Sequence, residues 1–166
     1  YDIAHITGMS IKGKNIEEIT FKQEPAEGDA GLYSGSFIFT TPTLENIRLS
    51  YNAQEELLSA LPTFSITEFI ADEINDLSIY GLDEPSLDLT LDLTITETVE
   101  EQTKTTTDTL HYLWGDSLEN GNIYFMEAGG SSVYTMSSSF LDSLLELLDP
   151  FKLSEKWICL ANIADV

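Results

Sequence analysis

The 166-residue chain has one cysteine, two histidines and only seven basic residues. A single cysteine excludes an intrachain disulfide, and the position of Cys159 in the apolar run 157–160 predicts a buried, unreactive thiol. Seven basic against 29 acidic residues give a net charge of −22. With no cationic stripe to displace counterions, nucleic acid and anionic membrane surfaces are excluded as expected partners. Such acidity is typical of a solvated surface, and it also fits a bound cation or a basic partner protein.

Long apolar runs are also missing. No segment approaches the roughly 20 apolar residues of a membrane-spanning helix, and the N-terminus carries no signal peptide. The chain begins at Tyr1 rather than at a methionine and ends at Val166, so we expect it to be part of a longer protein. An apolar content of 42% over this length predicts a folded protein with one or two cores.

The stretch from Asp76 to Val99 consists of a turn followed by a nearly regular alternation of apolar and polar residues. In the turn, Gly81 can supply a positive φ. The apolar positions are Leu87, Leu89, Leu91, Leu93, Ile95 and Val99. The polar positions are Asp88, Thr90, Asp92, Thr94, Thr96 and Thr98. A period of two predicts a strand with one buried and one solvated face, as in an antiparallel sheet. Each buried aliphatic contributes about 1.5–3 kcal/mol, so we expect this strand to be central to the sheet.

Short apolar runs between glycine, proline and polar residues predict the other strands. They lie at 3–11, 17–22, 35–40, 109–114, 123–126 and 133–136, with 100–104 as a hairpin tip and Gly129-Gly130 as a turn. Residues 64–70 fit either a short strand or an irregular crossing. Helices are predicted near 52–61 and 138–148. Asn52 is the expected N-cap of the first helix, with Glu55 completing a capping box, and Pro62 and Pro150 are expected to end the two helices.

The two halves of the sequence contain the same elements in the same order. Gly35-Ser-Phe-Ile-Phe is matched by Gly121-Asn-Ile-Tyr-Phe, and the leucines and stop of the first helix by those of the second. The sequence therefore predicts an α+β fold of two tandem related units, each a mainly antiparallel meander packed against a leucine-rich helix. The predicted units are residues 1–85 and 86–153, and residues 154–166 are expected to begin a truncated further unit.

Several motifs together resemble one protein family. They are the turn Ile79-Tyr-Gly-Leu-Asp-Glu-Pro85, the pair Gly115-Asp116, the strand with Tyr124, the pair Val133-Tyr134 and the serine-capped leucine helix. From about Ile3 to Leu153 the chain resembles the family called domain of unknown function 4340. It departs from the family pattern at 37–39, where a tryptophan strand is usual, and in a longer hairpin at 100–107.

This resemblance implies an exported bacterial protein, tethered to the cytoplasmic membrane by an N-terminal hydrophobic segment that this sequence does not contain. It also implies a role for some relatives as auxiliary parts of ABC-type transport systems. The family has no established catalytic residues, so the resemblance assigns no site residue here. It likewise names no cofactor, metal ligand, specific partner or oligomeric state.

One motif suggests an enzyme instead. Gly115-Asp116-Ser117-Leu118 has the spelling of the nucleophile block of GDSL esterases. A serine nucleophile needs a histidine base, and those enzymes place it near the C-terminus, whereas no histidine follows Ser117. The upstream Asp108-x-x-His111 is expected to lie on the same strand, and glycine with aspartate also forms ordinary turns.

Metal and ligand sites have weaker signals. His5 and His111 have no second histidine or cysteine at ligand spacing, so zinc is not expected. Acidic residues gather at the central turn and strand: Asp72, Glu73, Asp76, Asp83, Glu84, Asp88 and Asp92. They match no known calcium loop, and a solvated acidic face explains them. Tyr80 and Tyr124 are expected to pack in the sheet rather than to line a pocket.

The sequence thus predicts a non-enzymatic, extracytoplasmic, membrane-anchored module that acts by protein contacts or as a transport accessory. A GDSL-type serine hydrolase centred on Ser117 and an acidic cation-binding domain are the alternatives. No catalytic, cofactor-binding or metal-binding residues are assigned.

Overall fold

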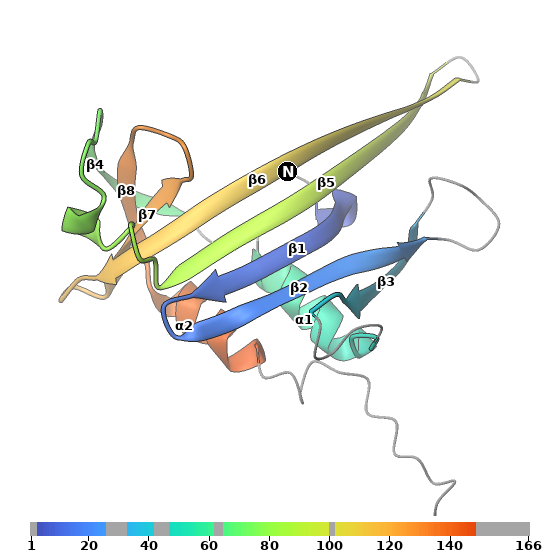
Figure 1. The fold of residues 1–166 in the computed structure, drawn as a ribbon, viewed down its shortest axis with the longest axis horizontal. Helices are drawn as coiled ribbons and strands as arrows, with labels where there is room; N and C mark the ends of the chain where they lie inside the picture. Colours follow the sequence, from blue (N-terminus) through green and yellow to red (C-terminus); the bar gives the residue numbers. More distant parts are fainter. Residues whose placement is uncertain (1–2, 26–32, 42–46, 62–64, 100–101, 149–166) are drawn as a thin grey trace, which may run out of the picture.

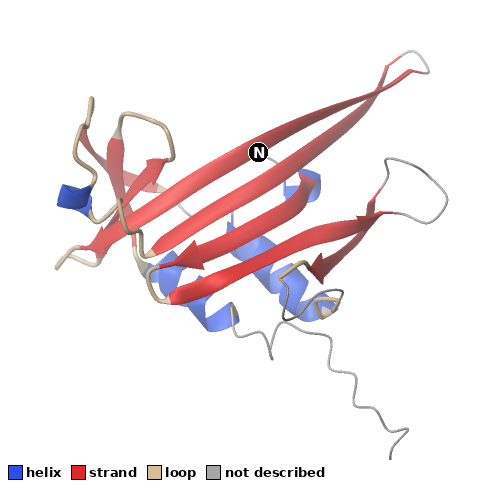
Figure 2. Ribbon diagram, viewed as in Figure 1, coloured by secondary structure: helices blue, strands red, loops and turns tan. Residues whose placement is uncertain are grey.

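The structure is a computed structural model that describes residues 3–25, 33–41, 47–61, 65–99 and 102–148. These residues form a mixed α+β fold, a twisted antiparallel sheet with two helices on one face (Figures 1 and 2). The strands are β1 (Ile6–Gly13), β2 (Ile16–Pro25), β3 (Tyr33–Phe39), β4 (Ile66–Ala71), β5 (Leu87–Val99), β6 (Gln102–Ser117), β7 (Asn122–Glu127) and β8 (Val133–Ser137). The helices are α1 (Tyr51–Ala60) and α2 (Ser139–Leu147), with short 3-10 turns at η1 (Ile3–His5) and η3 (Ser78–Tyr80).

All eight strands of the described residues belong to one sheet, in the order β3-β2-β1-β5-β6-β7-β8-β4. The strands of the two halves of the sequence meet where β1 pairs with β5, with Ile11 opposite Leu89. Strand β4, which precedes β5 in the sequence, crosses to the far edge and pairs with β8. The structure therefore has one continuous sheet, and the tandem units with a boundary at 85/86 remain a prediction.

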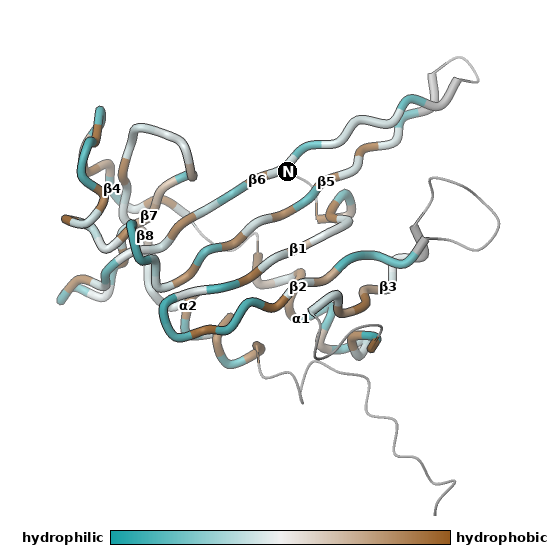
Figure 3. Tube along the Cα trace, in the orientation of Figure 1, coloured by the Kyte–Doolittle hydropathy of each residue, from teal (hydrophilic) through white to brown (hydrophobic). Residues whose placement is uncertain are grey.

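The alternation of β5 is confirmed in the described part of the strand. Its apolar side chains point toward α1 and α2, and Leu87, Leu89 and Leu91 are completely buried (Figure 3 shows the alternation along the strands). Trp114 of β6 is also completely buried, and its Nε1–H donates to Met136 Sδ at 2.9 Å. The main core thus lies between the sheet and the helices.

The face of the sheet opposite the helices is solvated over only part of its width. Over β6, β7 and β8, this face is covered by the segment that connects β4 to β5. Leu82 of that segment packs with Leu113, Met126 and Val133 in a second, smaller core. Tyr80 and Tyr124 meet edge to face with ring centroids 5.0 Å apart. Tyr124 lies in the sheet as predicted, whereas Tyr80 lies in the turn η3 and packs onto it.

The first helix begins at a different residue from the one predicted. Ser50, not Asn52, is the N-cap, and its Oγ accepts a hydrogen bond from Ala53 N–H. The side chain of Gln54 ties α1 to β3: its Oε1 accepts from Phe37 N–H, and its Nε2 donates to the Gly35 carbonyl. Ser50, two residues before Asn52, takes the cap because its backbone is extended, whereas Asn52 already lies within the helix.

Other boundaries also differ. The returning strand β6 is much longer than the predicted 109–114 and includes 102–104, which had been expected to lie in the hairpin tip. Residues 64–70, left open by the sequence, include most of β4. The predicted roles of Pro62, Pro150 and Cys159, and the further unit at 154–166, lie outside the described residues.

Candidate functional site

The turn that carries the family-like motif packs against the strand that carries the esterase-like motif. Gly81 ends η3 with a left-handed φ of 64°, as the sequence predicted, and a Cβ there would collide with the Asp116 carboxylate. A Cβ on Gly115 would collide with the carbonyl oxygen of Tyr80. Ser86 Oγ donates to the Gly115 carbonyl at 2.8 Å. Gly81 is thus favoured by its left-handed φ, and Gly115 is required by the close approach of the Tyr80 backbone; both roles are structural.

Ser117 lies at the exposed end of β6. His111 precedes it by six residues on the same strand, which at about 3.3 Å per residue separates them by roughly 20 Å. His5 is farther away, because the neighbouring Ile6 pairs with Leu93 and Leu93 pairs with Asp108. Neither imidazole of the chain is therefore within reach to act as a base for Ser117.

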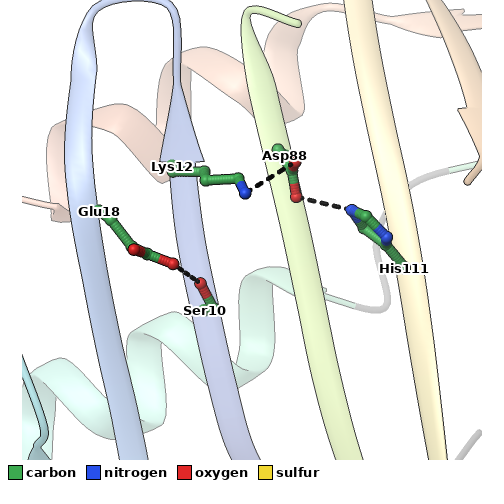
Figure 4. A network of polar contacts seen from close by, with 5 residues as sticks. All are labelled: Ser10, Lys12, Glu18, Asp88 and His111. Atoms are coloured by element: carbon green, nitrogen blue, oxygen red, sulfur yellow. Dashed lines mark hydrogen bonds and ion pairs between the residues drawn. The ribbon is translucent and has the colours of Figure 1, made fainter.

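The structure brings together a carboxylate, an ammonium group and an imidazole on the open face of the sheet (Figure 4). Asp88 of β5 is 8% exposed. Its Oδ1 lies 2.8 Å from His111 Nε2 of β6, and its Oδ2 lies 3.5 Å from Lys12 Nζ of β1. Both carboxylate oxygens are thus engaged by groups on the two neighbouring strands. The arrangement links three strands and contains no nucleophile of its own.

A shallow depression of about 690 Å³ lies beside this network, between the β1–β2 turn and residues 83–85. Lys14 N–H donates to the Pro85 carbonyl at 2.9 Å, which joins the two turns. Lys14 Nζ lies 3.7 Å from Glu84 Oε2 at the exposed surface. The two lysines of the depression are therefore already paired with carboxylates of this chain.

The acidic residues of the central turn are dispersed by the fold. Among the described residues, no three His, Cys, Asp or Glu side chains converge in a way that could hold a metal ion. Asp72 instead accepts hydrogen bonds from Ser131 and Ser132 at 2.8 Å each, and these bonds lower the pKa of its carboxyl group. The hydroxyl and N–H of Ser78 lower the pKa of Asp76 in the same way. Asp72 thus joins the end of β4 to the β7–β8 turn, and Asp76 holds a local turn.

Exposed apolar side chains gather on edge strand β4. Ile66 and Phe69 are each 56% exposed, and the Phe69 ring meets the Tyr134 ring edge to face with centroids 5.7 Å apart. In the register on β8 they lie opposite Met136 and Tyr134. At the other end of the sheet, by contrast, residues 47–49 cover the edge of β3 through two backbone hydrogen bonds.

The sequence predicted neither the contacts of Asp88 with His111 and Lys12 nor the exposed apolar patch on β4. Asp88 and His111 stand at polar positions of consecutive strands, but their pairing depends on the register of the long hairpin. The β4 patch was missed because 64–70 has no clear period, and its exposure depends on crossing to the far edge.

Comparison with known proteins identifies the class to which this fold belongs. Residues 40–156 match the family described as "Domain of unknown function (DUF4340)", and the chain belongs to this family. The resemblance inferred from the turn and strand motifs is therefore confirmed. No curated protein matches the chain.

Among solved structures, a thioesterase-like protein from Clostridium sporogenes ATCC 15579 is similar over 90% of this chain and 99% of its own. The sequence identity is 14% and the TM-score is 0.36, values too low to carry an argument about fold or activity. Within the described residues, no helix has the length and apolarity needed to cross a membrane.

Proposed function

We propose that this chain is a non-enzymatic, extracytoplasmic interaction module of a membrane-anchored bacterial protein, and that it serves as a transport accessory. The observation that supports this most directly is the apolar patch of Ile66 and Phe69 on edge strand β4. Exposed apolar side chains grouped on one edge are typical of surfaces that contact another protein.

The partner is expected to contact the side chains of this patch rather than to extend the sheet. The register of β4 on β8 shifts between Ile66 and Glu68 and again between Phe69 and Ala71. Such irregularities disturb the row of backbone groups that an added strand would need. An aromatic ring held at one side by Tyr134 is, however, a suitable anchor for a protein interface.

The non-enzymatic assignment is supported by the position of Ser117. With His111 roughly 20 Å away along β6, a serine hydrolase would lack its base. Treatment with a fluorophosphonate probe is expected to leave the chain unlabelled. Labelling that disappears in Ser117→Ala would overturn the proposal and favour the hydrolase.

The partner-binding patch can be tested by site-specific photo-crosslinking in the native host. A photoreactive phenylalanine is introduced at Phe69 in the full-length protein, and the matched control carries it at Tyr51, an exposed aromatic residue on α1. We expect a discrete crosslinked product from position 69 that is lost when Ile66→Asp is added. A subunit of an ABC-type transporter in that product would support the accessory role. No product at 69, or the same products from both positions, would contradict it.

The location can be tested separately. Protease added to intact spheroplasts is expected to digest the domain, as it would any extracytoplasmic protein. Protection until the membrane is broken would contradict the extracytoplasmic assignment without bearing on the β4 patch.

We also propose that the fold arose by duplication of a sheet-and-helix unit. Ile38 of β3 bridges Arg48, and at the matched positions Tyr124 of β7 pairs with Thr135 of β8. Gly35 and Gly121 have similar left-handed φ values of 78° and 81°, and each hairpin is followed by a helix on the same face. An experimental structure in which the backbones of 35–61 and 121–148 follow different paths would contradict the duplication.

A further inference from the structure

The β5–β6 hairpin extends well beyond the rest of the sheet (Figure 1). The pairing of β1 with β5 ends at Leu93, and β7 begins to pair with β6 only at Tyr112. One further contact on that edge is the hydrogen bond from Ala128 N–H to the His111 carbonyl at 2.8 Å. Among the described residues, no strand pairs with the outer edge of β6 over residues 102–110.

The backbone groups of this free edge can be assigned from the neighbouring pairs. Because the His111 carbonyl points toward β7, the odd-numbered residues of β6 direct their N–H and C=O groups outward. On the free edge these are Thr103, Thr105, Thr107 and Thr109. Thr109 N–H donates a hydrogen bond to the carboxylate of the adjacent Asp108 at 2.9 Å, as expected for a backbone donor with no strand beside it.

The same edge has few of the features that prevent strand addition. Its pairing with β5 is regular from Leu87 to Val99 with no register shift, and the segment contains no proline. Threonine, which favours strands, occupies most of its positions. The charged residues of the segment are Lys104 and Asp108, both exposed and without an ion pair within the described residues.

We propose that the partner of this edge is a second copy of the chain, whose β6 pairs antiparallel to the first about a two-fold axis at Thr106. In this register Lys104 of each copy lies opposite Asp108 of the other, on the same face of the sheet. Thr105 lies opposite Thr107 of the other copy, and Thr103 opposite Thr109. These pairs join residues whose backbone groups all point outward, so each pair exchanges two hydrogen bonds.

Charge complementarity selects this register over its neighbours. Moving the axis to residue 105 or 107 would still pair outward-pointing backbones but would take Lys104 away from Asp108. Thr106 is also the midpoint of the free edge 102–110, so the dimer uses the whole edge without reaching β7. The paired edge of 102–110 buries only a small area, and we therefore expect a weak, reversible dimer.

The net charge of −22 does not prevent this association. On the β7 side, the rest of each copy begins at His111, roughly 17 Å along the hairpin from the axis. On the other side, β1 reaches Leu93, opposite Asp108, but it lies two strands or roughly 10 Å to the side of the paired edge. The bodies are then separated by more than the Debye length of about 8 Å at physiological ionic strength. Opposite charges meet only at the paired edge, where Lys104 and Asp108 lie.

A cysteine at the axis tests the geometry. In a Cys159→Ser background, Thr106→Cys places two thiols opposite each other at about 4.5–5.5 Å between Cα atoms, within disulfide range. Mild oxidation is expected to give a covalent dimer. The matched control is Thr96→Cys, an exposed threonine on the other strand of the same hairpin, which is expected to give at least tenfold less dimer. Equal yields from both positions would overturn the proposal.

Charge variants test the register by sedimentation equilibrium up to about 1 mM protein. Lys104→Glu and Asp108→Lys each place like charges opposite one another, and each is expected to weaken self-association at least tenfold. An equimolar mixture of the two variants is expected to associate again, as is Lys104→Asp/Asp108→Lys. A monomeric parent chain, or charge variants that associate like the parent, would overturn the proposal.

This dimer is independent of the partner-binding patch on β4. Ile66→Asp is expected to abolish the crosslink at Phe69 but to leave self-association unchanged. Conversely, Lys104→Glu is expected to weaken the dimer and to leave the crosslink intact. The two proposals can therefore fail separately.

Discussion

Gly115 lies directly against the carbonyl oxygen of Tyr80, so that no side chain fits between the strand β6 and the turn before β5. This contact joins the two most distinctive motifs of the sequence. It explains the glycine of the esterase-like motif by backbone packing, and it holds Leu82 over the second core.

Gly115→Ala is expected to destabilise the fold by about 1–3 kcal/mol, because the added Cβ collides with backbone that cannot rotate away. Urea unfolding followed by circular dichroism measures the effect. Ser117→Ala, two residues along the same motif and exposed, is expected to change stability by less than about 0.5 kcal/mol. Equal stability of the two variants would show that the contact with Tyr80 is unimportant.

Leu82→Ala tests whether the segment before β5 is packed on the sheet. Leu82 is 2% exposed in the second core, so we expect a loss of about 2–4 kcal/mol. Ile79, three residues earlier in the same segment, is 67% exposed, and Ile79→Ala is expected to cost less than about 0.5 kcal/mol. The comparison uses the free energy of unfolding in urea. A similar small loss for both would mean that the segment does not cover the sheet.

Asp88→Ala is expected to destabilise the chain by about 1–3 kcal/mol, because it leaves His111 and Lys12 without the carboxylate between them. Asp92→Ala is the matched control, since it removes the same charge from an exposed position on the same face of β5. We expect it to cost less than about 1 kcal/mol. Thermal unfolding at pH 7 measures both, and a larger effect from Asp92 would contradict the assigned network.

The two aspartates of the turn region provide a pH test. Hydrogen bonds lower the pKa of Asp72 and of Asp76 below the ordinary 3.8, so both favour the folded state above that pH. This contribution is lost as the pH falls below 3.8 toward the lowered values. Carboxyl NMR titration is expected to show that Ser131→Ala/Ser132→Ala raises the pKa of Asp72 alone, and that Ser78→Ala raises that of Asp76 alone. A common shift of both would contradict separate turns.

The correspondence between sequence and structure is closest where a pattern is local. The alternation from Leu87 onward predicted which side chains of β5 enter the core, and Gly81 predicted a left-handed turn residue. It is weakest where distant segments meet. Asn52 was predicted as the N-cap because Glu55 follows it at capping-box spacing, but the backbone is extended at Ser50 and already helical at Asn52, so Ser50 takes the cap.

The two candidate surfaces, the patch on β4 and the free edge of β6, also combine local features visible in the sequence with positions that only the fold sets. Nothing in the sequence of 66–71 signals that these residues form the far edge of the sheet, because edge position is set by which strands lie between. The free edge at 102–110 likewise depends on where β7 begins to pair, although the threonines and the Lys104–Asp108 spacing that make it suitable for self-pairing are visible in the sequence.

The sequence by itself determined the strand periodicity, the two helices and the family, because these depend on local spacing and on short motifs. The tertiary structure alone decided that all strands of the described residues join one sheet, that Ser117 has no histidine within reach, and that Asp88 lies between His111 and Lys12. These depend on strand order and register, which are fixed by the burial of side chains far apart in the chain.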